Sequence, residues 1–518
     1  IKIGSKEGDG GFVETSGQTL TMQGNVNGVS KGKNGQWLID PTDITINAVA
    51  SANVTNASNT WSGAGTNTTA NVLNTSIINA LSNGTSVTVT TASTGTAGGN
   101  LTVAADLVVT NPSNSSLTLF ANQSLAFNNV NVCATGTGTL GLTATAANGT
   151  LTLNNSNFSL NGGTAALTGT STTATGVSLT GNVYFNGNDR IALTGSGINN
   201  FNGVSQSGTL VQNNGNLSIT GSTNGTGTGV AFTGTLTQND GSMNITGTSN
   251  SGVGVNLSPT SFIQNSGTIN ITGTSNLGNG VYVGGTLVQS ASNINGVINI
   301  SGSSNSTSLN GIEFNPTNLT QNNGSLNLNG SSLGNGISFI GVVTQNNGSI
   351  NITGQSSGGP DSYGIYRSSG NLTQNSGSLN ITGVATNGTG MWLNDGNVTQ
   401  NNGTMNVTGV STKYIGLVIK NNITQINGNI NFNGASDIST GAYFQQQGAI
   451  AYPLLINGNV NITGTSNTAA GVNLNSGSGT TITLNNGSLN ITGTSKSGIG
   501  VDISSKSGLV QNNGRLNI

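Results

Sequence analysis

One unit of sequence recurs throughout the second half of the chain and limits what the chain can fold into. From about residue 204, each unit contains a segment such as SLNITG, two shorter apolar segments, and corners rich in Asn and Gly. The corner glycines recur at a mean interval of about 27 residues, which is the length of one coil of a solenoid. These glycines are Gly215, Gly241, Gly267, Gly296, Gly324, Gly348, Gly377, Gly403, Gly428, Gly458, Gly487 and Gly514.

Apolar and polar residues alternate within the unit. In one copy of SLNITG, Leu379 and Ile381 would face one side of a strand and their polar neighbours the other. Two further apolar segments per unit, such as residues 371–373 and 280–283, have the length of short strands. The N-G and S-G pairs between them supply the positive φ angles of tight corners, which Gly adopts without strain.

The repeat therefore predicts an all-β fold: a right-handed parallel β-helix (β-solenoid) with three short strands per coil and almost no α-helix. Stacked coils would place equivalent positions about 4.8 Å apart, so that Leu lies on Leu inside and Asn on Asn at the corners. We expect three blocks of sequence. They are residues 1–48, residues 49–203 with irregular coils and a loop near 51–71, and residues 204–518 with regular coils.

The composition excludes several classes of protein. Disordered chains combine low hydrophobicity with high net charge, whereas 33% of these residues are hydrophobic and the formal net charge is -2. The 11 Lys and Arg residues are scattered and form no basic stripe, so we expect no binding of nucleic acid. No apolar run approaches the roughly 18 residues of a membrane span.

Nothing in the sequence predicts an enzyme, a cofactor or a metal site. Parallel β-helices include polysaccharide lyases and hydrolases, but these need clustered carboxylates. With no His and one Cys, His-based triads, Cys-His pairs and the usual zinc sites are excluded. Five of the acidic residues fall in different coils: Asp240, Glu313, Asp361, Asp395 and Asp502.

The first fifty residues carry a more specific motif. They contain GDGGFVETSGQTLTMQGNV from Gly8 and GKNGQWLIDPTDITINA from Gly32. Together these segments resemble the VETSG and WL-[LI]-DP pattern of two-partner secretion exoproteins, with the high-molecular-weight adhesins nearest and filamentous haemagglutinin as a wider relative. The resemblance extends to about residue 150. On the residues alone, we expect Trp37, Leu38 and Ile39 to fill the core.

The resemblance implies a function. The chain would be exported through an outer-membrane two-partner-secretion transporter and remain extracellular, on the surface of a Gram-negative-type bacterium. It would form the structural or adhesive shaft of a fibre that binds glycans or proteins on host or neighbouring cells. Two alternatives stay open: an inert rod or matrix filament that presents a toxin or binding tip located elsewhere, and, more remotely, an ice-binding solenoid.

Two further expectations concern the chain ends and modification. The sequence shows no initiator Met or export signal, so we expect the parent chain to extend past both ends, or open coil faces to associate with one another end to end or laterally.

An Asn-x-Ser/Thr sequon recurs at one outward position of the unit, although Asn327 and Asn431 occupy that position without one. The adhesin resemblance implies single hexoses on these Asn side chains, whereas an Asn- and Thr-rich repeat also produces sequons by accident while forming polar ladders. The sequon residues are Asn244, Asn270, Asn299, Asn351, Asn380, Asn406, Asn461 and Asn490.

Overall fold

The computed structural model shows a parallel β-solenoid of about 17 turns with about 26 residues per turn. The all-β solenoid expected from the repeat is therefore confirmed, with a coil close to the expected length. The chain divides into two compact units, Ile1–Gly247 and Thr248–Ile518. The structure describes residues 1–16, 21–22, 26–40, 43–49, 54–57, 60–63, 69–91, 99–111, 113–289, 296–444, 454–474, 481–503 and 508–518.

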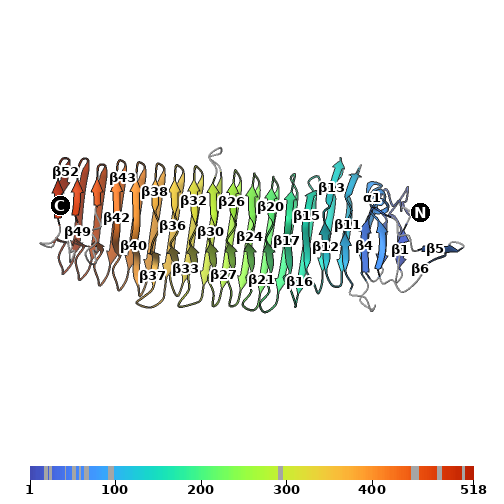
Figure 1. Cartoon of the computed structure of the whole chain (residues 1–518), viewed down its shortest axis with the longest axis horizontal. Coiled ribbons are helices and arrows are strands. Elements are labelled where there is room, and N and C mark those ends of the chain that lie inside the picture. The colour runs from blue at the N-terminus through green and yellow to red at the C-terminus, as the bar shows by residue number, and fades with distance from the viewer. Residues whose placement is uncertain are drawn as a thin grey trace. The chain divides into compact units, whose positions relative to one another are not determined.

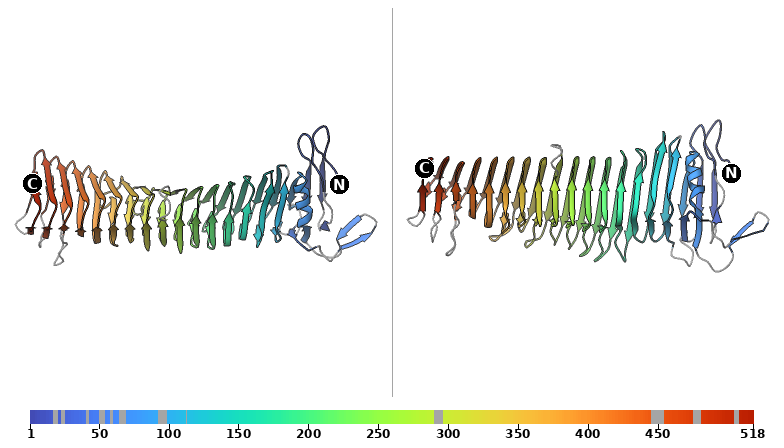
Figure 2. Two further views of the ribbon diagram at one scale, coloured as in Figure 1. Left: turned by 90° about the horizontal axis from the view of Figure 1, so that it is seen from above. Right: turned by 45° about the horizontal axis from the view of Figure 1, so that its top comes forward.

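In the first unit, parallel strands form two sheets (Figure 1, Figure 2). One sheet contains β1 (Phe12–Ser16), β3 (Gln36–Asp40), β8 (Ser86–Thr90), β11 (Ser115–Ala121), β14 (Leu140–Ala146), β16 (Thr164–Ser171), β18 (Arg190–Gly197), β21 (Asn216–Thr223) and β24 (Ser242–Ser249), which crosses the division between the units. The other contains β2 (Thr21–Met22), β4 (Asp43–Asn47), β7 (Thr69–Leu73), β9 (Leu101–Val103), β10 (Leu107–Asn111), β12 (Leu125–Asn128), β13 (Asn131–Gly136), β15 (Leu151–Ser159), β17 (Val177–Phe185), β19 (Val204–Gln206), β20 (Thr209–Gln212), β22 (Val230–Phe232) and β23 (Thr235–Gln238).

The second unit repeats this arrangement. Its long strands are β27 (Thr268–Ser275), β30 (Val297–Ser304), β33 (Ser325–Ser332), β36 (Ser349–Ser356), β39 (Ser378–Ala385), β41 (Thr404–Ser411), β43 (Asn429–Ser436), β46 (Asn459–Ser466), β49 (Ser488–Ser495) and the shorter β52 (Arg515–Asn517). The second sheet contains β25 (Val255–Leu257), β26 (Ser261–Gln264), β28 (Val281–Val283), β29 (Thr286–Gln289), β31 (Ile312–Phe314), β32 (Asn318–Gln321), β34 (Ile337–Phe339), β35 (Val343–Gln345), β37 (Tyr363–Arg367), β38 (Leu372–Gln374), β40 (Thr389–Gln400), β42 (Leu417–Gln425), β44 (Ala442–Phe444), β45 (Leu454–Ile456), β47 (Val472–Asn473), β48 (Thr481–Leu484), β50 (Val501–Asp502) and β51 (Gly508–Gln511).

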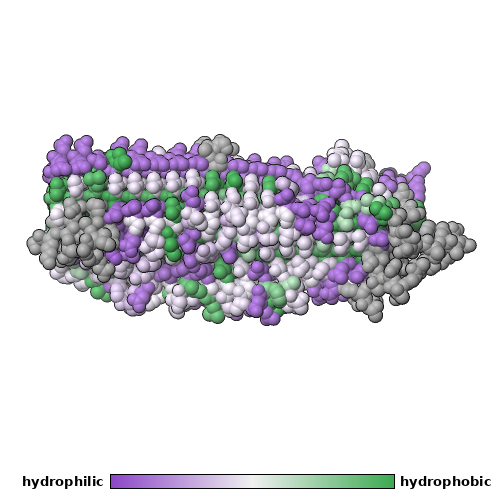
Figure 3. Space-filling view, viewed as in Figure 1, coloured by the Kyte–Doolittle hydropathy of each residue, from purple (hydrophilic) through white to green (hydrophobic). Residues whose placement is uncertain are grey.

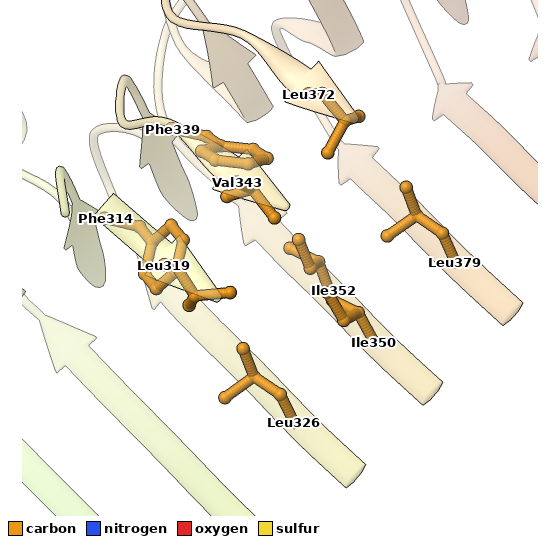
Figure 4. Close-up of a pocket in the computed structure, with 9 residues that line it drawn as sticks. All are labelled: Phe314, Leu319, Leu326, Phe339, Val343, Ile350, Ile352, Leu372 and Leu379. Atoms are coloured by element: carbon orange, nitrogen blue, oxygen red, sulfur yellow. The ribbon is translucent and has the colours of Figure 1, made fainter. Parts of the chain in front are cut away.

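The core consists of inward side chains stacked on their equivalents. In β39, Leu379 and Ile381 are buried, and Leu379 lies between Ile350 and Met405 of the neighbouring strands. Figure 4 shows such side chains in the second unit, where the space between Leu326, Leu379 and their neighbours is too small for a water molecule. The inward and outward positions predicted from period-two alternation are confirmed in this strand.

Glycines serve two purposes in the coil. Corner glycines such as Gly377 and Gly403 have φ angles of 81° and 92°, as the N-G and S-G pairs predict. The glycine of the NITG segment has another role: a Cβ atom on Gly383 would collide with the carbonyl oxygen of Gly390, which lies across the interior. The interpretation of glycine as a corner residue is therefore incomplete, because these strands also need glycine for close approach of two backbones.

The first unit contains the irregular elements. Helix α1 (Asn74–Ser82) buries Ile77, Ala80 and Leu81 against the solenoid. Strands β5 (Val54–Ala57) and β6 (Thr60–Gly63) pair antiparallel, while much of the loop expected near 51–71 lies outside the described residues. The expected block boundaries after residues 48 and 203 stay predictions.

The two motif segments of the first fifty residues meet in the structure. Strand β1, with the sequence FVETS, pairs with β3, with the sequence QWLID, and Val13 lies opposite Trp37. Trp37 is buried, and its Nε1 donates a hydrogen bond to Thr15 Oγ1 at 3.0 Å. Ile39 is also buried, but the expectation for Leu38 was wrong, because alternation turns it to the outer side.

Candidate functional site

Stacked asparagines form a continuous column on the outer side of the long strands. In the second unit, the Nδ2 atom of each residue donates to the Oδ1 atom of its equivalent one coil earlier, over distances of 2.7–2.8 Å. Most of these side chains are half-buried by their neighbours. We call them the asparagine column: Asn270, Asn299, Asn327, Asn351, Asn380, Asn406, Asn431, Asn461 and Asn490.

The asparagine column contains seven of the eight predicted sequon residues, and Asn244 occupies the equivalent outward position of β24. Asn327 and Asn431, which lack a sequon, bond in the same way as the others. The ladder therefore does not depend on the sequon. Glycosylation stays a prediction, and peptide mass spectrometry of natively secreted protein, searched for added hexose, tests it.

A second asparagine column was missed in the sequence. It lies on the outer side of the second sheet and contains Asn371, Asn397 and Asn422 in successive coils, with Asn318 at the same position two coils earlier, beyond Val342; each of the four begins an Asn-x-Thr sequence. Three of them are exposed, and the amide bonds between coils are longer, at 3.3 Å from Asn397 to Asn371 and 3.1 Å from Asn422 to Asn397. The recurring segment N-[LVI]-T-Q was the available signal.

Glutamines form a ladder inside the solenoid. Each is almost fully buried, and its Nε2 atom donates to Oε1 of the preceding glutamine at 2.9–3.1 Å in the second unit. The same Nε2 atom also donates to two backbone carbonyl oxygens, one at the corner and one in the next coil. For Gln374 these are the carbonyl oxygens of Gly377 and Thr404. We call this set the glutamine ladder: Gln264, Gln289, Gln321, Gln345, Gln374, Gln400 and Gln425.

Two charged residues, Arg367 and Asp189, are buried in the part of the chain that the structure describes, where Arg367 Nε finds no hydrogen-bond partner. Arg367 projects into the interior over the ring of Phe339, and its guanidinium donates to the carbonyl oxygens of Asp395 and Gly370. Burial lowers the pKa of Arg367 to about 10. Asp189 accepts backbone N–H bonds at a corner, and burial raises the pKa of its carboxyl group.

The acidic residues singled out in the sequence do not converge. Glu313 accepts a hydrogen bond from Asn279 Nδ2, and Asp395 sits at a corner with a φ angle of 52°. Within the described part of the chain, no three His, Cys, Asp or Glu side chains come close enough to hold a metal ion. Asp240, Asp361 and Asp502 lie in other coils, as their spacing predicts.

The outer surface is polar but carries little charge. Within each unit, hydrophilic and near-neutral side chains form rows from coil to coil on the face in Figure 3, interrupted by single hydrophobic residues. Among the described residues, no helix has the length and apolar character needed to cross a bilayer. No protein-family model and no curated protein matches this chain.

Proposed function

We propose that the chain is the structural and adhesive shaft of a large secreted bacterial surface fibre that attaches to cells or other surfaces. The observation that carries the shaft is the continuity of the coils in each unit, where paired strands, stacked core residues and amide ladders connect successive coils. Such stacking distributes a load over many backbone and side-chain hydrogen bonds. Adhesion rests on the resemblance of the β1 and β3 motifs to surface adhesins.

The same proposal covers export and location. The chain would pass through an outer-membrane two-partner-secretion transporter and remain outside, on a Gram-negative-type cell. An outer surface of amides and hydroxyls suits this setting, because it stays hydrated without depending on pH or salt. No enzymatic role is proposed, since the acidic groups are spread over separate coils.

The finer fold is also part of the proposal: a right-handed solenoid with three strands per coil. Crossovers between parallel strands are right-handed in about 98% of cases. Each unit of the repeat contributes one long and two short strands, as in β33, β34 and β35. A crystal structure of the chain at a resolution that traces the backbone tests both features.

Attachment is tested with beads that carry the purified chain. Beads should attach to epithelial or bacterial cells, and beads with heat-denatured chain should not. Intact chain on beads that never attach would favour the inert rod or filament. The ice-binding alternative needs a regular threonine face. The seventh residue of the long strands points outward, and threonine is replaced there by Gln355, Val384 and Val410. A thermal-hysteresis measurement tests it.

A further inference from the structure

A polar groove opens on the outer side of the second sheet in the first unit. It lies across β13, β15 and β17 and has a volume of about 620 Å³. Five asparagines and one aromatic residue account for most of its lining: Asn131, Asn155, Asn157, Asn182, Tyr184 and Asn186. The size falls in the range of small-molecule sites, and the lining is unusually rich in amides.

A bulge in the strands creates the groove. Pairing of β15 with β17 shifts register between Asn154 and Ser156, and Asn155 at the shift has a φ angle of 47°. Gly181 in the next coil has a φ angle of 61°, and Asn129 in the preceding coil one of 55°. Three successive coils therefore adopt the left-handed conformation at the same corner, which a non-glycine residue takes up at a cost.

The floor of the groove is fixed by side-chain amides. Asn131, Asn157 and Tyr184 are register partners in successive strands. Asn157 Nδ2 donates to Asn131 Oδ1 at 3.2 Å, and Asn186 Nδ2 donates to Asn157 Oδ1. Asn131 Nδ2 in turn donates to Asp106 Oδ2 at 3.1 Å. A ligand would meet these groups already ordered, which reduces the entropic cost of binding.

Other groups at the groove remain available. The Asn182 side chain and the Tyr184 hydroxyl make no hydrogen bond to any described residue. Tyr184 is 37% exposed, so part of its ring faces solvent. Asn155 Nδ2 and Asn186 Nδ2 each use one N–H bond within the network and retain a second, because a primary amide carries two.

These groups match the chemistry of a sugar. A hydroxyl both donates and accepts, as an amide does, and the C–H face of a pyranose packs on an aromatic ring. Among the described residues that line the groove there is no Lys or Arg, and Asp106 bonds to the lining residue Asn131, so an anionic ligand would be disfavoured. The groove crosses three strands, about 10 Å at the ladder spacing, which suits roughly two sugar rings.

We propose that this groove binds a neutral oligosaccharide, with Tyr184 packed against a sugar ring and the surrounding asparagine amides bonded to its hydroxyls. The assignment deepens the adhesive part of the proposed function and rests on it. Asn182 and Tyr184, at its open side, would make the contacts that form only on binding.

Isothermal titration of the full chain with linear neutral hexaoses of glucose, mannose and galactose tests the assignment. At least one should bind at concentrations of about 1 mM, and Tyr184→Ala should weaken that binding about tenfold or more. Tyr184→Phe keeps the ring and should bind nearly as well. Tyr282→Ala is the matched control, because Tyr282 projects outward from β28 in the other unit.

Asn155→Gly separates binding from folding. Glycine accepts the positive φ angle and preserves the bulge, so the variant should fold normally and bind more weakly because it lacks the amide.

Three results would each overturn the proposal: wild-type chain that binds none of the three hexaoses, Tyr184→Ala that binds as well as wild type, or tighter binding of sialyllactose than of the hexaoses. Beads that attach to cells without any hexaose binding would overturn only the groove, whereas hexaose binding without attachment would overturn the adhesive shaft.

Discussion

Replacing one glutamine inside the glutamine ladder should destabilise the solenoid more than replacing the glutamine at its end. Gln374 lies in the middle: its Nε2 donates to Gln345 Oε1 at 3.1 Å, and its Oε1 accepts from Gln400 Nε2 at 2.9 Å. Gln425 lies at the end, because its partner in the next coil is Ile456. Its Oε1 atom accepts no hydrogen bond from any residue that the structure describes. Leucine at each position gives a matched pair of variants.

The difference between the variants can be estimated by following the buried oxygens. Gln374→Leu leaves Gln345 Oε1 without a donor, which costs about 1–3 kcal/mol for a buried acceptor. Gln425→Leu leaves Gln400 Oε1 without a donor but also removes the unpaired Oε1 of Gln425, so the number of unpaired oxygens is unchanged. Both variants give up the same kind of hydrogen bonds to backbone carbonyls and bury the same leucine side chain. Gln374→Leu should therefore cost about 1–3 kcal/mol more.

Hydrogen exchange suits this comparison because a solenoid opens locally. The free energy of opening is read from amide protection in the long strands next to each site, β36, β39 and β41 for Gln374 and β41, β43 and β46 for Gln425. Protection should fall further around Gln374→Leu. Equal losses in the two variants would refute the reasoning, since they would show that an unpaired Oε1 costs nothing in this interior.

Three other substitutions test separate features. Ile456→Gln should not raise local protection in hydrogen exchange, because it supplies a donor to Gln425 Oε1 but places a new buried, unpaired Oε1 opposite Leu484. Gly383→Ala should cost about 1–3 kcal/mol by overpacking, with Thr382→Ser on the outer side as the neutral control in thermal unfolding. Arg367→Leu should leave the chain at least as stable at pH 7. Burial lowers the pKa of Arg367 to about 10, so the cost of burying its charged form applies in full below about pH 10, including at pH 7, and decreases as pH rises through that value. A loss above about 2 kcal/mol would show that its bonds to carbonyl oxygens dominate.

Alternation in the sequence was enough to predict the strands, the inward Leu379 and Ile381, and the outward asparagine column. It was also enough to place Gln374 inside, because Gln374 lies two residues after the buried Leu372. The polarity of glutamine argues against an inward position, because glutamine is rarely buried. Its amide is satisfied here through the stacking of identical side chains, which one unit of the sequence does not reveal. Helix α1 had a signal too, since Ile77, Ala80 and Leu81 recur at helical spacing.

Other features could not be predicted from one chain. The run LNNSNF in the first unit contains three asparagines, and nothing in it indicates that Asn155 is the one that takes a positive φ angle. That choice depends on the fit of β15 against its neighbours, and the groove depends on that choice. The glycine of the NITG segment could not be predicted to be essential for the same reason. Only the folded structure brings a second backbone so close that a Cβ atom would not fit.

The amide ladders have a direction, and this bears on how the chain can reach its native state. Within the second unit, each Asn and Gln of the two ladders points an N–H group towards the preceding coil and offers an oxygen to the following one. A completed coil thus presents a row of acceptors that the next coil can satisfy. Strand partners are about 26 residues apart, so each added coil closes a loop of nearly constant length and nearly constant entropic cost. Nucleating the first coils would then be the slow step, and lengthening the solenoid would add little to the folding time.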